Sequence, residues 1–135
     1  MPDDCVFPPY FPHDCPPPPL MENPGTYYRL VRSAVNLPIE EFHTTYEKNN
    51  GILTGGLGSR CRDCAVSLYD TIDHASGFLE NHPNFAQRCI LSIHLSGGHG
   101  VVQLGGKDGH VSWWVPVRVS RLNFIGEEVF YHAQQ

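Results

Sequence analysis

The fold class that the sequence predicts is α+β, with one largely antiparallel sheet and two helices on one face, preceded by an extended proline-rich arm. Three observations predict it. Nine of the twelve prolines fall within residues 1–24. Two amphipathic helical patterns follow within residues 36–83, and alternating apolar and polar side chains between glycine pairs occupy residues 89–119. Helices early in the chain and hairpins late in it are typical of α+β domains.

The first 24 residues are predicted to form an arm outside the folded core. Each proline fixes φ and removes a backbone donor, so the segment favours polyproline II over helix or sheet. Such a segment is already extended before it binds, which lowers the entropy lost when it lies in a partner's groove. Phe7, Tyr10 and Phe11 are the predicted anchors. We therefore expect an interaction protein that docks on a protein partner or on its own copies, with a disordered tail as the alternative.

Residues 25–135 are predicted to form one domain, because a second core of half this length would be marginal. A net charge of −5 with only nine Lys and Arg argues against a nucleic-acid surface. No apolar run reaches the roughly 20 residues that span a bilayer, and the N-terminus lacks the pattern of a signal peptide. We expect no membrane contact and a cytoplasmic location. The five cysteines are accordingly expected to be thiols unless a metal ion binds them.

The first half of the domain is predicted to alternate strand and helix. Residues 26–32 are rich in aromatic and β-branched side chains, which favours a strand. Residues 39–48 carry apolar side chains at helical spacing and predict a helix of about three turns. Residues 49–64 hold four glycines and predict a long loop. A short strand at 65–69 then leads to a second helix, capped by Asp70 and ending before Pro83; its apolar stripe is Ile72, Ala75, Ser76 and Leu79.

The second half is predicted to be β hairpins. Residues 89–95 are apolar almost throughout, which is typical of a central strand covered on both faces. Glycine pairs at 97–100 and 105–110 predict tight turns around a short strand. Residues 111–119 alternate again, although Pro116 indicates an edge or a bend. Glu128 to His132 are expected to add a last strand.

Trp113 and Trp114 are adjacent in a predicted strand. Their side chains must then point to opposite faces of the sheet, so both cannot enter one core layer. One of them should be covered by the arm, a helix or another subunit. We therefore take both as candidate binding residues on the body of the domain, beside ordinary packing within the chain.

Cys61 and Cys64 form the only CxxC of the chain and could supply half of a tetrahedral zinc site. A zinc-stabilised structural domain is the third function considered, although no second CxxC closes the site and two ordinary loop thiols are favoured. Completion would need scattered residues such as His74, Cys89, His94 and His99. His94, His99 and His110 lie near the glycine-rich turns and could form a small cluster. His43 is interpreted as a histidine at the edge of the core.

Three short segments resemble small uncharacterised bacterial domains. They are YYRLV at 27–31, SLYDT at 67–71 leading into a helix, and Gly109-His110 before a tryptophan. The resemblance implies a layout and brings no activity with it.

Arg29, Ser67 and Glu128 occur in the order of the motif residues of ADP-ribosyltransferases, which the chain resembles faintly. That motif places an Arg in an early strand, a Ser at the start of a later strand and a Glu near a final one. The resemblance implies a toxin-type enzyme acting on NAD. Arg29 would hold a phosphate of the dinucleotide, Ser67 would support the ribose pocket, and Glu128 would stabilise the oxocarbenium-like centre as the glycosidic bond opens.

Overall fold

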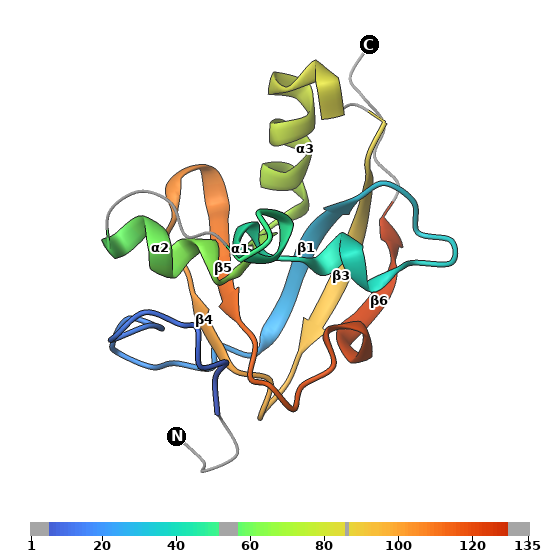
Figure 1. Ribbon diagram of the computed structural model, residues 1–135. Helices are drawn as coiled ribbons and strands as arrows, with labels where there is room; N and C mark the ends of the chain where they lie inside the picture. The colour runs from blue at the N-terminus through green and yellow to red at the C-terminus, as the bar shows by residue number, and fades with distance from the viewer. Residues whose placement is uncertain (1–5, 52–56, 86, 130–135) are drawn as a thin grey trace.

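The computed structural model of the chain describes residues 6–51, 57–85 and 87–129. Within these residues lies a six-stranded sheet with the strand order β4-β5-β2-β1-β3-β6 (Figure 1). All neighbouring strands run antiparallel. The α+β class and the antiparallel sheet are thereby confirmed. The strands are β1 (Gly25–Val31), β2 (Val66–Tyr69), β3 (Cys89–Leu95), β4 (Val101–Gln103), β5 (His110–Trp114) and β6 (Ile125–Val129).

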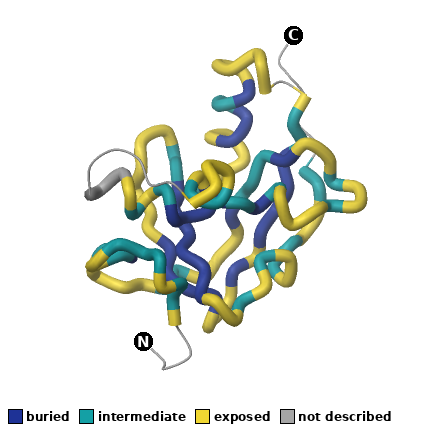
Figure 2. Tube along the Cα trace, viewed as in Figure 1, coloured by how far each residue is buried: buried dark blue, intermediate teal, exposed yellow. Residues whose placement is uncertain are grey.

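β3 is buried on both faces, as its apolar sequence predicts. Ile90 packs under the helix α3 (Ile72–Asn81), against Ala75 and Leu79. Its neighbour Leu91 belongs to the larger core cluster on the opposite face, since successive side chains of a strand point to opposite sides. Figure 2 shows burial concentrated along the strands. That larger cluster includes Tyr27, Val31, Phe42, Val66, Leu68, Ile93, Val102, Val111 and Trp113.

The helix α3 follows β2, as predicted, but begins with a different cap. Thr71, rather than Asp70, accepts a hydrogen bond on its side chain from the backbone N–H of His74, at 3.1 Å. Ala75, Ser76 and Leu79 are buried, whereas Ile72 is partly exposed at the first turn. Asp70 is thereby left free to make a different contact, described with the site.

The helix predicted over 39–48 is interrupted in the structure. A 3-10 turn, η1 (Ile39–Phe42), ends at His43, whose ψ of 142° is extended. Thr44 then starts a separate short helix, α1 (Thr45–Lys48), through a capping box with Glu47. Phe42 packs in the larger core cluster while α3 lies on the other face of the sheet. The helical segments therefore occupy both faces, which differs from the expected placement on one.

The loop predicted over 49–64 contains a helix, α2 (Leu57–Asp63). Residues 52–56 of that segment lie outside the described residues. Glycines weaken but do not forbid a helix, because tertiary contacts override local propensity. Here the helix ends against the strand β2, where Cys64 and Ala65 are buried beside Trp114.

The strand predicted over 111–119 stops at Trp114. Pro116 lacks the N–H that would continue the ladder, and Val117 is exposed. The last strand lies earlier than predicted: β6 spans Ile125–Val129, and residues 130–132 of the predicted strand lie outside the described residues.

The described part of the arm, residues 6–24, is tied to the body. The backbone N–H of Val117 donates to the carbonyl of Val6, and that of Val102 in β4 donates to the carbonyl of Met21, both at 2.9 Å. A disulfide joins Cys15 to Cys61 of α2 across a Cα separation of 5.5 Å. The expectation that these two cysteines are thiols is therefore corrected: the fold brings them within bonding distance. In Figure 1 the arm lies beside β4 and below α2.

Candidate functional site

The tryptophan pair shows what the arm covers. Trp113 enters the larger core cluster, where its indole donates to the carbonyl of His99 at 3.0 Å. Trp114 faces the other way and donates to the carbonyl of Cys61 at 2.9 Å. Trp114 is covered by the arm together with the end of α2. The sequence left open whether the arm, a helix or another subunit would cover one of the two tryptophans, and here the cover comes from the same chain. The cluster around Trp114 contains Cys64, Ala65 and Val101, and the partly buried residues packed against this cluster are Phe7, Tyr10, Phe11, Cys15, Tyr46 and Cys61.

The predicted docking anchors are thus engaged in the fold. Trp113 and Trp114 are fully buried, and Phe7, Tyr10 and Phe11 are half-buried or close to it. Tyr10 stacks on Tyr46 of α1 with ring centroids 3.9 Å apart. The two tryptophans are therefore closed to a partner while the arm stays in place, and the three arm aromatics are only partly accessible.

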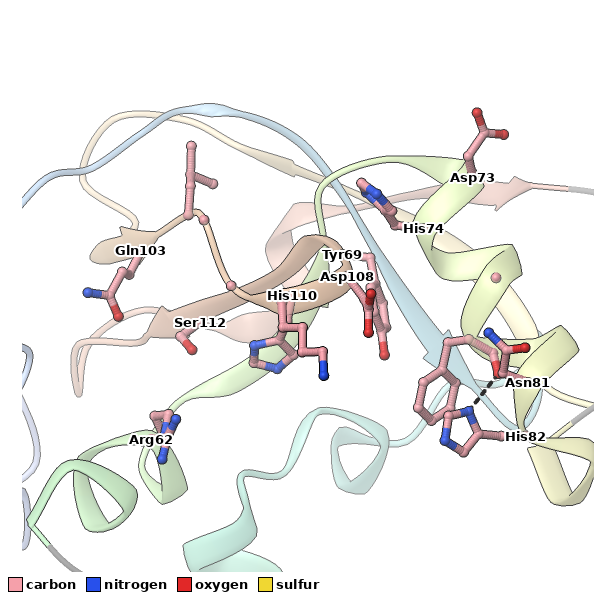
Figure 3. A pocket seen from close by; sticks show the side chains of 16 residues that line it. Arg62, Tyr69, Asp73, His74, Asn81, His82, Gln103, Asp108, His110 and Ser112 are labelled. Atoms are coloured by element: carbon pink, nitrogen blue, oxygen red, sulfur yellow. Dashed lines mark hydrogen bonds between the residues drawn. The ribbon is translucent and has the colours of Figure 1, made fainter.

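Two neighbouring cavities open over the β2–β5 side of the sheet. The smaller, about 600 Å³, is called the Arg29 cavity; it is lined by Arg29, Arg32, Glu40, Glu41, His43, Lys48, Ser67 and Arg88, among others. The larger, about 780 Å³, is called the His74 cavity and lies between α3, Arg62 of α2 and the turn 103–110 (Figure 3). The two share Tyr69, Phe78 and His110, so they form one continuous surface.

At the Arg29 cavity, β1 and β2 are joined at one register pair, Tyr28 with Tyr69. Beyond that pair the guanidinium of Arg29 spans the space between the strands. Its Nη1 donates to the carbonyl of Ser67 at 2.8 Å, and its Nε and Nη2 donate to the carbonyl of Glu41 at 3.1 and 2.9 Å. Two of the three residues in the predicted catalytic set, Arg29 and Ser67, are therefore brought together.

The charge of this cavity is positive, although the protein as a whole is acidic. Burial lowers the pKa of Arg29 to about 10, which still leaves the group charged at neutral pH. Among the residues that the structure describes, no carboxylate lies within ion-pair distance of it. Burial and the nearby Arg29 and Arg88 also lower the pKa of Lys48. The four cations Arg29, Arg32, Lys48 and Arg88 face only two carboxylates, Glu40 and Glu41, in the lining.

His74, in the wall of the His74 cavity, forms a carboxylate–imidazole pair with Asp70. Asp70 Oδ1 lies 2.5 Å from His74 Nδ1. This contact fixes the proton on Nδ1 and leaves Nε2 as the acceptor of the neutral ring. Gly109 packs directly against the pair: its φ is +79°, and an added Cβ would collide with both His74 Nδ1 and Asp70 Oδ1. The pair can therefore orient a histidine for proton transfer at the cavity wall.

His110 stands where the two cavities meet. Burial lowers its pKa, and the positive charges of Arg62 and Arg29 lower it further. Its ring packs edge-on against Tyr69, with centroids 6.2 Å apart. His110 is consequently a neutral imidazole at pH 7, beside the cationic end of the site.

Aromatic rings form the α3 wall of this surface. Phe78 stacks on His82 with centroids 4.0 Å apart and lies 5.8 Å from Tyr69. Arg88 lies over the ring of Phe85 at 5.2 Å. Flat rings beside cations suit a ligand that has both a planar ring and negative charge.

The remaining predicted residues lie elsewhere. Glu128 is on β6, paired with Leu91 of β3, and lines neither cavity. Cys61 is in the disulfide, so the CxxC cannot chelate a metal in this state, and Cys64 is buried. In the described ranges no three His, Cys, Asp or Glu side chains are grouped to hold a metal ion.

The three histidines near the turns do not act together. His94 bonds Thr26 Oγ1 at 2.9 Å, His99 bonds the carbonyl of Glu22 at 2.6 Å, and His110 packs on Tyr69. The Asp70–His74 pair is not among the residues that the sequence predicts, because Asp70 is expected there to cap the helix. Its signal was available: residues four apart at a helix start lie on one face. The Arg29 cavity had no such signal, because its side chains come from at least five separate stretches of the sequence.

No protein family, curated protein or solved structure matches this chain. In the part of the chain that the structure describes, every helix is too short or too polar to cross a membrane.

Proposed function

We propose that the Arg29 cavity binds a phosphate-bearing ligand of the nucleotide class. The observation that carries this proposal is a charged, partly buried guanidinium that bonds two backbone carbonyls and, among the described residues, no carboxylate. Carbonyl oxygens hold the group in place without neutralising its charge, and the Glu41 carboxylate acts on it only from beyond ion-pair distance. An anionic ligand would supply that compensation, and a planar guanidinium matches phosphate oxygens geometrically.

ADP-ribosyl transfer is the reaction proposed for this site, on the resemblance of Arg29, Ser67 and Glu128 to the motif of those enzymes. The hydrogen bond between Arg29 and Ser67 at the Arg29 cavity supports the part of this proposal that concerns NAD binding. Arg29 would hold a phosphate of NAD and Ser67 would support the ribose pocket. Glu128 lines neither cavity in the described structure, so the observations support dinucleotide binding more strongly than catalysis.

Calorimetric titration with NAD, ADP-ribose and inorganic phosphate tests the proposal. Arg29→Gln is expected to weaken binding of every phosphate-bearing ligand by at least about tenfold, since charge-assisted hydrogen bonds contribute about 1.5–3 kcal/mol each. Arg118→Gln, a matched exposed arginine outside both cavities, should bind as the parent does. Because Arg29 also bonds two carbonyls, Arg88→Gln provides a second test that leaves those bonds intact. Equal affinities for the parent and both cavity variants would remove the proposal.

Release of free nicotinamide from NAD tests the enzymatic part separately. Turnover that falls on Glu128→Gln, with binding unchanged, would support the transferase assignment. Binding without any nicotinamide release would reduce the assignment to a nucleotide-binding protein.

Docking through the arm is the second candidate function, and the exposed apolar side chains of the arm favour it. Val6, Leu20 and Met21 are 55%, 44% and 52% exposed. These three side chains, rather than Phe7, Tyr10 and Phe11, are the exposed apolar groups of the arm that a partner could contact. Sedimentation equilibrium of the full chain and of a Leu20→Ser/Met21→Ser variant tests self-association: a concentration-dependent mass that the variant loses would support docking, and a monomer in both cases would exclude docking on a second copy.

The cytoplasmic location also remains a proposal. Cytosolic reductants keep most protein thiols reduced, so the Cys15–Cys61 bond would have to be transient there. Alkylating the thiols at the moment of cell lysis measures the fraction of the protein that carries the Cys15–Cys61 bond. A bond found fully formed would favour an oxidising compartment instead.

A further inference from the structure

Three cysteines meet in the cluster around Trp114. Cys15 and Cys61 form the disulfide that ties the arm to α2. Cys64 is a free thiol, 2% exposed, and packs in the same cluster as both of them. A free thiol beside a disulfide is the arrangement that thiol–disulfide exchange requires.

The spacing of Cys61 and Cys64 favours a reaction between them. Cys61 lies in the last turn of α2, and the backbone N–H of Cys64 donates to the carbonyl of Cys61 at 3.1 Å. Residues three apart on such a turn have Cβ atoms roughly 5–6 Å apart. A disulfide needs about 3.5–4.5 Å between them, so a small unwinding of this helix end suffices.

We propose that Cys64 exchanges with the Cys15–Cys61 disulfide, which moves the bond to Cys61–Cys64 and releases the arm. The thiolate of Cys64 attacks the sulfur of Cys61, the bond to Cys15 breaks, and Cys15 leaves as a thiolate. Cys15 then takes up the proton that Cys64 lost. One disulfide and one thiol are present before and after, so no external oxidant or reductant is consumed.

The folded state holds this reaction back. Burial raises the pKa of Cys64 to about 11, with further contributions from the negative charges of Asp63 and Glu47. Only the thiolate attacks, and at pH 7 roughly one molecule in ten thousand carries it. The exchange rate should therefore rise about tenfold per pH unit in the neutral and mildly alkaline range, and also when α2 loosens.

The exchange would change which side chains are exposed on the surface around Trp114. The arm would keep only its non-covalent contacts, such as the Val117–Val6 and Val102–Met21 hydrogen bonds and the stacking of Tyr10 on Tyr46. Departure of the arm uncovers the face of Trp114 and frees Phe7, Tyr10 and Phe11, the side chains of the arm that the sequence predicts as docking anchors. This inference does not depend on ligand binding in the Arg29 cavity.

Disulfide mapping of the full chain tests the proposal. The protein is incubated without added thiol at several pH values from about 7 to about 10, acidified, alkylated and digested with trypsin. Trypsin cleaves at Arg62, between the two cysteines, so a Cys61–Cys64 bond appears as two linked peptides together with alkylated Cys15. We expect this product to accumulate about tenfold faster per pH unit. Cleavage of the arm by chymotrypsin should accelerate in parallel; trypsin does not report on the arm, because residues 1–28 contain no Lys or Arg.

Cys64→Ser should abolish the product and keep the arm protected, and Cys64→Ala repeats the test if the serine variant fails to fold. Cys89→Ser is the matched control: it removes the other free thiol of the described residues, outside the cluster, and should exchange as the parent does. The proposal is overturned if the parent forms no Cys61–Cys64 bond at any pH. It is equally overturned if only a Cys15–Cys64 bond forms, since the arm then stays attached, or if Cys64→Ser releases the arm at the parent rate.

Discussion

The guanidinium of Arg29 donates to the carbonyl of Ser67 across the opening between β1 and β2, at 2.8 Å. In a regular sheet that carbonyl would accept from a neighbouring strand. Here the Arg29 side chain supplies the hydrogen bond that a neighbouring strand would otherwise donate. The opening between the two strands lies at the Arg29 cavity. Arg29 therefore both links the two strands and contributes positive charge to the Arg29 cavity.

Arg29→Lys is expected to lower the free energy of unfolding by about 1–3 kcal/mol, because a single ammonium cannot reach both the Ser67 and the Glu41 carbonyl. Urea unfolding followed by circular dichroism measures this. Arg118→Lys, on the exposed surface, should change stability by less than about 0.5 kcal/mol. Equal midpoints for the two variants would contradict the bridging role.

Gly109→Ala is expected to destabilise the fold by about 2 kcal/mol or more, because the position has φ +79° and a Cβ there meets His74 and Asp70. Gly77→Ala is the matched control in α3, where a Cβ meets nothing, and should stabilise by about 0.5–1 kcal/mol. Thermal unfolding compares them. Adding His74→Ala to Gly109→Ala should recover part of the lost stability. If the stability changes of the two substitutions simply add, residue 109 does not pack closely against His74.

Cys15→Ser is expected to lower stability by about 4 kcal/mol, since the disulfide closes a loop with a sequence separation of 46. Reduction of the parent with dithiothreitol should give the same urea midpoint as the variant. A midpoint that stays unchanged on reduction would show that the bond does not form in solution.

Acid should weaken the contact between Glu47 and Arg121. Burial by itself raises the pKa of Glu47, but hydrogen bonds from Arg121 and Thr44 outweigh it, and the net pKa is lowered. A carboxyl with a lowered folded pKa stabilises the fold above its unfolded pKa of about 4.3, and this contribution disappears as the pH falls through the folded value. The melting temperatures of the parent and Glu47→Gln should therefore converge between about pH 6 and about pH 3. A constant difference over that range would contradict the assignment.

Local patterns were sufficient where neighbours in sequence are also neighbours in space. The apolar run 89–95 predicted a buried central strand, and β3 is one. The stripe of Ala75, Ser76 and Leu79 predicted the buried face of α3. The pattern over 39–48 was misleading, because apolar spacing alone did not reveal that Thr44 and Glu47 form a capping box that starts a new helix.

The sequence by itself determined the α+β class, the antiparallel sheet and the opposite orientations of Trp113 and Trp114, because periodicity and strand geometry act over a few residues. Only the tertiary structure decided that the arm covers Trp114, that Cys15 bonds Cys61, and that Arg29 meets Ser67. These contacts join residues 38 or more positions apart. Their geometry depends on how the whole sheet is assembled, and no local pattern of side chains encodes that.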